Sequence, residues 1–566
     1  MAMKYRSFFS LLHSAATAAA LGGVALTVPF AMAAQSANTA SESSASAWPS
    51  QQNYVNAARD NKDWILPAKD YSNNRYISAS QITPHNVNQL DRVWRFVIPD
   101  DSPIETAPIV WHGTIYITSA HDHVYAVDAK TGTLKWSFED NPHVISFAAN
   151  RGVGLMDGKV YIGTLDGHLI ALDAKTGKKV WDVVAVHDTS NTFYSMAPVP
   201  YKNMLLLGAS NGDWGGVGYI TAFNPDNGKR IWEWKTVPGP GEPGNDTWSG
   251  DSWKRGGAAT WGGVAIDPKT DTIYLDLGNP QPDFLGTVRK GKNLYSNSMV
   301  ALDISGSEPK MKWYHQFIPH DTHDWDPAMG PVLFKGKVDG EERNLVAAGD
   351  KAGNFWILDA DNGKLVDHTV VSFQHNQNTE PSKNGNVACP NTNGGVEFHG
   401  GTYDPNTNTF FVPSTNQCGF WQSSGKVTYI AGTFYLGGAF PKLVGPDTGW
   451  FNAIDVSTGA FKWRHHFDLP ANGGALVTST GVVFTGEIGG DFDAFDTQTG
   501  KMLWHYDTGS TINAPAAAFL DDGTEYVIVA SGQPGNMKVP ELTKTNDGSM
   551  LSAFALKSTA AKKPTM

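Results

Sequence analysis

One phrase recurs along the chain and constrains its fold more than any other feature. A small or aromatic residue, Ala, any residue and Asp or Asn are followed two residues later by Thr-Gly or Asn-Gly, and three residues after that by Trp. Alternating apolar residues form a strand, the Asp and Gly form a tight turn, and the Trp starts the next strand and packs between units. The copies are Tyr125–Trp136, Ile170–Trp181, Thr221–Trp232, Asn452–Trp463, Asp493–Trp504, Val300–Trp313 with an insertion, and Ile357–Val366 without its Trp.

Repeats of one strand–turn–strand unit, mostly about 40 to 50 residues apart, are typical of a β-propeller. The two ends of the chain carry the halves of a further copy, because Ser552–Leu556 matches the first half and Val93–Ile98 the second. Strands from both termini in one blade would close the ring and remove free sheet edges. We therefore expect an all-β, eight-bladed propeller whose tryptophans dock between blades.

The N-terminal residues are typical of a secretion signal. Lys4 and Arg6 precede the apolar stretch 8–28, and Ala31-Met32-Ala33 offers small residues for cleavage. The alternative is a retained membrane anchor, since the apolar stretch is long enough to span a bilayer. We predict a signal peptide at 1–33, a linker and N-terminal extension at 34–63, a propeller domain at 64–556 and a polar tail at 557–566, with no membrane-spanning segment after cleavage.

Charge and cysteine content narrow the possible partners. The net charge is −12, and cleavage after residue 33 would remove two positive charges, leaving −12 − 2 = −14. No basic stripe offsets this charge, which argues against a nucleic-acid partner. In an exported protein the two cysteines, Cys389 and Cys418, are most simply one disulfide. The chain has no Cys-x-x-Cys-His motif for a c-type haem, so electrons from any oxidation would leave through a separate partner.

The repeats and the segments between them resemble the periplasmic pyrroloquinoline quinone (PQQ)-dependent dehydrogenases, from about Trp64 to Leu556. The resemblance implies that Glu105 in IETAP, Arg151 in NRGVG and Ser195 in TFYSMAP bind the cofactor. PQQ is a tricarboxylate ortho-quinone, and a guanidinium with hydroxyl donors suits its carboxylates. The alternative for Arg151 is a salt bridge on the surface or between blades.

Two further motifs resemble the metal-binding segments of the family. Asp213, in GASNGDWGG, stands where many members have a Glu calcium ligand, and Asn279 in LGNPQP matches an Asn ligand. A carboxylate and an amide oxygen suit a calcium ion that is completed by quinone oxygens. The alternative is that both are ordinary turn residues.

Other positions match residues that surround the quinone ring. By this resemblance, Trp261 in ATWGG is the flat platform beneath the ring, and Lys351 in GDKAGN is the catalytic cation that contacts its reactive carbonyl edge. Asn416 in STNQC also reaches the cofactor, and Asn472 in LPANGG covers an edge of it. Cys389 and Cys418 match a long-range disulfide of the family.

The chain departs from the family at three places, one of which is LPANGG, where many members have an aromatic residue before Asn-Gly-Gly. Ile145 and Ser146 replace an adjacent Cys-Cys pair that covers the quinone in many members, so His143 or Phe147 would have to cover it. Lys292 falls at the usual position of the catalytic Asp, and a protonated Lys cannot accept a substrate proton.

Asp283, in NPQPDF, is the predicted catalytic base, since it lies four residues after Asn279 and resembles a base motif of the glucose and quinate dehydrogenase branch. The alternative is a solvated loop residue in a degenerate site. The sequence predicts a periplasmic PQQ- and calcium-dependent dehydrogenase that oxidises an alcohol, polyol or sugar hydroxyl and passes electrons to a cytochrome c or a membrane quinone. The missing Cys-Cys pair and Asp283 favour a secondary alcohol, polyol or sugar over methanol. The alternative function is a non-catalytic propeller that binds or assembles other proteins.

Overall fold

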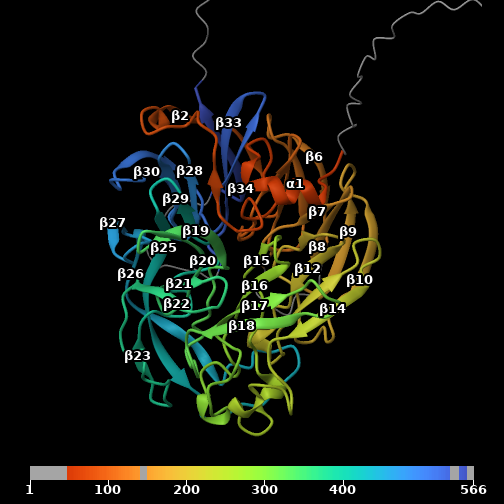
Figure 1. Cartoon of the computed structure of the whole chain (residues 1–566), viewed down its shortest axis with the longest axis vertical. Helices are drawn as coiled ribbons and strands as arrows, with labels where there is room; N and C mark the ends of the chain where they lie inside the picture. Colours follow the sequence, from red (N-terminus) through yellow and green to blue (C-terminus); the bar gives the residue numbers. More distant parts are fainter. Residues whose placement is uncertain (1–46, 141–148, 536–546, 558–566) are drawn as a thin grey trace, which may run out of the picture. The chain divides into compact units, whose positions relative to one another are not determined.

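The computed structural model describes residues 47–140, 149–535 and 547–557 (Figure 1). The predicted signal peptide and most of the polar tail lie outside these residues, as do Ile145, Ser146 and the two candidate covering residues, His143 and Phe147. Residues 47–63 of the predicted extension contain a short helix, and Trp64, at the predicted start of the propeller, is fully buried.

The described strands form eight sheets, five of them four-stranded with strands in sequence order. These five sheets are β3 (Ile109–Trp111), β4 (Thr114–Thr118), β5 (Val124–Asp128) and β6 (Leu134–Phe138); β7 (Gly154–Met156), β8 (Lys159–Gly163), β9 (His168–Asp173) and β10 (Lys179–Val184); β11 (Val199–Tyr201), β12 (Met204–Gly208), β13 (Tyr219–Phe223) and β14 (Arg230–Lys235); β15 (Val264–Asp267), β16 (Thr272–Leu277), β17 (Ser298–Asp303) and β18 (Lys310–Gln316); and β19 (Val332–Val338), β20 (Glu341–Gly349), β21 (Asn354–Asp359) and β22 (Leu365–Val370).

The other three sheets depart from this simple pattern. They are β23 (Asn386–Ala388), β25 (Thr409–Ser423), β26 (Gly438–Asp455) and β27 (Phe461–Phe467), with β24 (Thr402–Asp404) paired to β25; β28 (Ala475–Thr478), β29 (Val482–Gly486), β30 (Asp491–Asp496) and β31 (Met502–Asp507), with β1 (Tyr76–Ile77) added parallel to β28; and β32 (Ala517–Asp521), β33 (Thr524–Ser531), β34 (Met550–Leu556) and β2 (Leu90–Val97). The helices are short: α1 (Gln51–Asn56), η1 (Ala57–Arg59), η2 (Val87–Gln89), η3 (Gly212–Trp214), η4 (Asn245–Thr247), η5 (Ser252–Arg255) and η6 (Gly286–Val288).

The two ends of the described chain meet in one sheet. β2 pairs antiparallel with β34, from Leu90 opposite Leu556 to Val97 opposite Met550, and the two strands lie side by side in Figure 1. This is the pairing that the half-repeats predict. The predicted all-β propeller class is confirmed.

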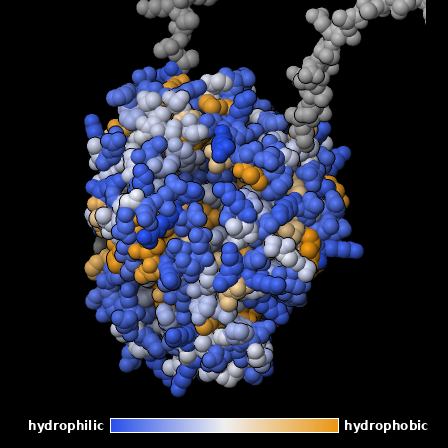
Figure 2. All heavy atoms as spheres, viewed as in Figure 1, coloured by the Kyte–Doolittle hydropathy of each residue, from blue (hydrophilic) through white to orange (hydrophobic). Residues whose placement is uncertain are grey.

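Burial distinguishes the first strand of a sheet from the last. All residues of β3, β7 and β11 are buried, whereas β6 and β10 alternate or run exposed. β3, β7 and β11 therefore lie in the interior of the propeller, whereas β6 and β10 reach the solvent. Much of the surface in Figure 2 is hydrophilic, with apolar residues in small scattered groups. None of the helices in the described ranges has the length and apolar character needed to cross a membrane.

Tryptophan docking joins successive sheets as the repeat predicts. The indole Nε1 of Trp136, on β6, donates to the carbonyl of Ala174 in the next repeat at 3.0 Å. The same ring covers Gly177, where an added Cβ would lie 2.5 Å from the indole, and Gly177 has a φ of +70°. Glycine at this turn is therefore required twice, once for its left-handed backbone and once for the close approach of the ring.

We expect Gly177→Ala to destabilise the protein more than Gly113→Ala. Gly113 has nearly the same φ, +71°, but no heavy atom lies within 4 Å of the position its Cβ would take. Both variants carry the left-handed strain of roughly 1–2 kcal/mol, and Gly177→Ala adds an overpacking cost of about 1–3 kcal/mol against Trp136. Denaturant unfolding of the two variants measures the difference, and equal losses of stability would contradict the docking contact.

Candidate functional site

One cavity of about 480 Å³ collects residues from loops that precede the first strands. Because first strands face the middle of the ring, the loops that enter them converge there. This volume lies within the usual range for a small-molecule site. Polar and aromatic lining residues that stand three to six positions before a first strand, or before β24, include Glu105, Arg151, Ser195, Trp261, Asp326, His399, Asn472 and Asn513.

Arg151 is the centre of one side of the cavity. Its Nη2 lies 2.8 Å from Oε2 of Glu105, and its Nη1 donates to Oγ of Ser195 at 2.8 Å. The guanidinium carbon lies 4.1 Å from the ring centre of Phe398 and 4.9 Å from that of Trp261. The three residues that the sequence predicts around the cofactor carboxylates are thus in direct contact. The salt bridge that was the alternative for Arg151 is present as well, and it lies inside the cavity.

Lys351 lies between two aspartates that the sequence motifs did not identify. Its Nζ is 3.3 Å from Oδ1 of Asp324 and 3.3 Å from Oδ2 of Asp326. The Nε1 of Trp261 donates to the same Oδ2 of Asp326 at 3.0 Å, and Nζ lies 5.4 Å from the Trp261 ring centre. The predicted platform and the predicted cation therefore belong to one hydrogen-bonded group.

The two predicted metal ligands also line the cavity. Asp213 lies on η3, the short helix that follows β12, and Asn279 lies just after β16. The backbone N–H of Asn279 donates to Oδ1 of Asp326 at 2.6 Å. Within the described ranges no group of three or more His, Cys, Asp or Glu side chains is arranged to hold a metal ion by itself. A cation at Asp213 and Asn279 would have one carboxylate and one amide oxygen from these two residues.

Asp283 does not line the cavity. It is 1 % exposed, its Oδ1 accepts from Nδ2 of Asn279 at 2.8 Å and from Gln281, and its Oδ2 has no hydrogen-bond partner among the described residues. Asp283 thus lies directly behind Asn279. Its alternative description as a solvated loop residue does not match this burial.

The two remaining predicted cofactor residues lie in different places. Asn472 lines the cavity, and its Oδ1 accepts from Oγ1 of Thr415 at 3.0 Å. Asn416 is not part of the cavity lining: its Oδ1 accepts from the N–H of Phe373 at 2.9 Å, and its Nδ2 donates to Thr448 at 3.3 Å. Asn416 is therefore the chain neighbour of Thr415, the residue whose hydroxyl contacts Asn472.

The sequence contains a pattern that could have identified Asp324 and Asp326. The segment HDTHDWDP carries three aspartates within six residues, directly ahead of a first strand. Asp321, the first of them, points into the protein and accepts from the N–H groups of His323 and Trp325. Only the folded loop shows that the second and third face the cavity.

Burial controls the charges of the site. Burial raises the pKa of Asp213 to about 6 although Lys351 opposes the shift, and burial raises the pKa of Glu397, another lining residue, to about 7. The pKa of Asp324 is also raised, by burial and by the neighbouring carboxylates. Burial alone would lower the pKa of Lys351, but Asp324 and Asp326 raise it, so Lys351 stays positively charged.

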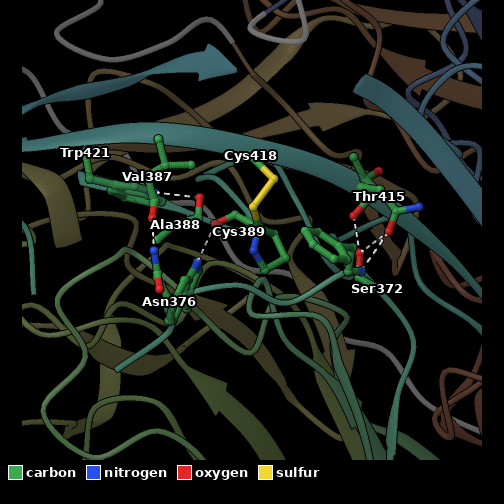
Figure 3. The surroundings of a disulfide bond; sticks show 12 residues. Ser372, Asn376, Val387, Ala388, Cys389, Thr415, Cys418 and Trp421 are labelled. Carbon is green, nitrogen blue, oxygen red and sulfur yellow. Dashed lines mark hydrogen bonds between the residues drawn. A yellow bond between two sulfur atoms is a disulfide. The ribbon is translucent and has the colours of Figure 1, made fainter. Parts of the chain in front are cut away.

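The disulfide and its surroundings are drawn in Figure 3. Cys389, directly after β23, is bonded to Cys418 on β25, and the Nε1 of Trp421 donates to the carbonyl of Ala388 at 3.1 Å. The next residues, Asn391 to Asn393, line the cavity, and the N–H of Asn391 donates to the carbonyl of Gln417. The predicted disulfide is present, and it ties this part of the wall to β25.

The polar atoms of the lining fit a polyanionic planar ligand. Several buried atoms of lining residues lack a partner in the described structure: Arg151 Nε, Asn211 Oδ1, His399 Nε2, Asn472 Nδ2 and Asn513 Oδ1. Buried polar atoms are normally paired, so this concentration indicates a polar ligand. A guanidinium, an ammonium and an indole ring around one space suit the carboxylates and the planar ring of PQQ.

Comparison with known proteins agrees with this geometry. Residues 64–371 match the family described as "Glucose/ethanol/alcohol dehydrogenase, beta-propeller domain". Residues 443–544 match a second family, described as "Outer membrane protein assembly factor BamB". The first match covers more than half of the chain, whereas the second is confined to a shorter C-terminal stretch.

Full-length relatives are dehydrogenases. The quinoprotein alcohol dehydrogenase PedH of Pseudomonas putida is 31 % identical over 546 residues, which cover 87 % of this chain and 91 % of the relative. A lanthanide-dependent methanol dehydrogenase of Methylacidiphilum fumariolicum is 30 % identical, with 83 % and 85 % covered.

Among solved structures, a europium-containing methanol dehydrogenase matches with a TM-score of 0.80 and 28 % identity, over 89 % of this chain and all of the other. A quinohemoprotein alcohol dehydrogenase of Pseudomonas putida has a TM-score of 0.83 at 25 % identity, with 92 % and 84 % covered. The fold and the site define a propeller quinoprotein. The chain belongs to the PQQ-dependent alcohol dehydrogenase family and is an oxidoreductase that acts on CH–OH groups.

We expect the Cys389→Ser, Cys418→Ser double variant to lose stability and to bind PQQ more weakly. A disulfide that closes a loop of 29 residues contributes about 3–4 kcal/mol, and its loss frees the wall at Asn391. Denaturant unfolding and a PQQ titration measure the two effects. Thiol labelling of denatured, unreduced wild-type protein is the control, and two reactive thiols there would contradict the bond.

Proposed function

We propose that this chain oxidises alcohols with an apolar substituent in the 480 Å³ cavity, with PQQ held above Trp261 and a hard cation between Asp213, Asn279 and the cofactor. The observation that carries the proposal is that one cavity joins the Arg151 group, the Trp261 platform, Lys351 and the two metal-ligand candidates.

The cofactor would be held mainly by groups that already touch one another. Arg151 and Ser195 would bind carboxylates, and Glu105 would hold the Arg151 guanidinium in place. Asn472 would bind an edge of the ring system, and Asn416 would act indirectly, because its neighbour Thr415 donates to Asn472. When bound, PQQ supplies a two-electron acceptor, and the organic chemistry of the oxidation belongs to it.

We assign proton removal from the substrate hydroxyl to Asp324. Its carboxylate lines the cavity and lies 3.3 Å from Lys351, the cation expected at the reactive edge of the quinone. A general base has to be within hydrogen-bond reach of the proton that it takes. Asp283 does not line the cavity and accepts a hydrogen bond from Asn279. We propose that it orients Asn279 as a metal ligand instead of taking the proton.

The lining also favours a particular kind of alcohol. Phe193, Trp214, Phe440 and Leu443 are part of the cavity wall. The ring centre of Trp214 lies 4.5 Å from that of Phe434, and Phe434 lies 5.2 Å from Phe440. A continuous aromatic wall suits an apolar substituent better than a sugar or polyol, whose hydroxyls would lose hydrogen bonds to water there.

The carboxylates of the site also bear on the identity of the metal. Asp213, Asp324 and Asp326 put several carboxylates at one end of the cavity, so calcium or a trivalent lanthanide would relieve their repulsion. Relatives include lanthanide-dependent methanol dehydrogenases, by name. We further propose that the mature protein works in the periplasm and passes electrons to a separate cytochrome c or membrane quinone.

Reconstitution tests the proposed function. The full chain is mixed with PQQ and calcium, lanthanum or excess chelator, and binding is followed by absorption and calorimetry. We expect one PQQ per chain with a metal and weak binding with chelator, followed by dye-linked oxidation of benzyl alcohol in preference to sorbitol, glucose or methanol. Asp213→Asn should lose the metal dependence, whereas Asp468→Asn, on the exposed surface, should not. Tight PQQ binding in chelator would remove the metal from the proposal.

The two aspartate variants test the assignment of the base. We expect Asp324→Asn to lower kcat on the order of a hundredfold or more, because an amide cannot accept a proton, while PQQ stays bound. Asp283→Asn should weaken metal affinity more than it lowers kcat at saturating metal. Lys292→Ala, on the surface, is the neutral control. If Asp283→Asn alone abolished turnover at saturating metal, Asp283 would be the base, as the sequence motif predicts.

A further inference from the structure

A second, smaller cavity of about 70 Å³ adjoins the first. Glu105, Arg151 and Phe398 line both spaces and therefore separate them. The rest of the small cavity is lined by the N-terminal segment 66–75, by Gly262 and Gly263, and by residues close to first strands. It is distinct from the proposed substrate space, and none of the roles assigned above uses it.

Arg75 lines this cavity and is 7 % exposed. Among the residues that the structure describes, its guanidinium has no ion pair and donates no hydrogen bond, and its Nε is buried without an acceptor. The guanidinium packs against Gly400, where an added Cβ would lie 2.4 Å from Nη1. Burial lowers the pKa of Arg75 to about 10, and no carboxylate offsets this effect.

Two other buried cations in the described chain show how unusual a buried cation without an acceptor is. Lys69, fully buried, donates to the carbonyls of Asp60 and Asp63. Arg289, also fully buried, donates to the carbonyl of Pro282 at 3.0 Å and to Asn293 at 2.9 Å. The fold thus provides acceptors for buried cations elsewhere and leaves Arg75 without any.

The acidic residues around the small cavity already have partners. Glu105 is paired with Arg151 at 2.8 Å, and Asp70 accepts from the N–H and the hydroxyl of Ser72. His399, next to Gly400, is held neutral, since burial and then Arg151 and Arg75 lower its pKa. A buried and uncompensated charge costs several kcal/mol, and a water molecule supplies no opposite charge.

We infer that the small cavity binds one inorganic monovalent anion of about the size of chloride, held by the guanidinium of Arg75. The volume accommodates such an ion with one or two waters. The anion neutralises Arg75 and so stabilises the packing of the N-terminal segment against the 398–400 turn. Because Phe398 and His399 line the large cavity, the anion also stabilises this part of the large cavity's wall.

Bromide replaces chloride in the test, since its anomalous scattering identifies it. Crystals of the full chain grown in bromide should show one anomalous peak in the small cavity, within hydrogen-bond distance of Arg75. In solution, the apo protein at constant ionic strength should unfold at a higher temperature in chloride or bromide than in gluconate, which is too large for the cavity. Above the dissociation constant, each tenfold rise in halide should add a constant increment.

The matched variants are Arg75→Met and Arg59→Met. Both remove one positive charge, and Arg59 is exposed on η1. Arg75→Met should lose the peak and the halide dependence, whereas Arg59→Met should keep both. A cavity that contains only water in wild-type crystals grown in bromide would overturn the inference, whether or not Arg75→Met folds. A halide dependence that persists unchanged in Arg75→Met would overturn it as well.

Discussion

The contact between a tryptophan and the turn glycine of the next repeat supports the rest of this structure. The indole covers a glycine whose Cβ would collide with it, and the indole N–H donates to a carbonyl of the same turn. The contact recurs: Trp94 donates to Ala129 at 3.2 Å, Trp313 to Ala360 at 3.1 Å and Trp463 to Thr497 at 3.0 Å. Successive sheets are thereby fixed relative to one another, and their first strands face the same interior.

Another docking contact joins two segments that are far apart in the sequence. Trp504 donates to the carbonyl of Leu90, the first residue of β2, at 3.2 Å, and β2 pairs with β34. A propeller stacked in this way brings its inner loops together, so residues hundreds of positions apart become neighbours. Arg151 and Phe398 are in contact only because the sheets that follow them face the same interior.

The interior that results is rich in charge. Lys351 lies between Asp324 and Asp326, Arg151 is paired with Glu105, and Arg75 has no partner in the described chain. Buried charges of this kind weaken a protein unless they are paired or bind a ligand. We interpret the large cavity as a site that PQQ and a cation complete, and the small one as a site that an anion completes. Both interpretations follow from the requirement that a buried charge be paired or bind a ligand.

The sequence by itself determined the propeller class, because the period of the repeat, its turn residues and its tryptophans act locally or between neighbouring units. The half-repeats at the two ends predicted their pairing, and family motifs located Glu105, Arg151, Ser195, Trp261, Lys351, Asp213, Asn279 and Asn472, all of which line one cavity.

Only the tertiary structure decided which nearby polar residues reach that cavity. It directs Asp324 and Asp326 inward, while Asp283 lies behind Asn279 and Asn416 bonds to Phe373 and Thr448. The physical reason is that spacing along a loop does not determine side-chain direction. The direction depends on which hydrogen-bond and ion-pair partners the other sheets and loops supply. Arg75 has no such partner in the described chain, because none of the segments packed around it supplies one.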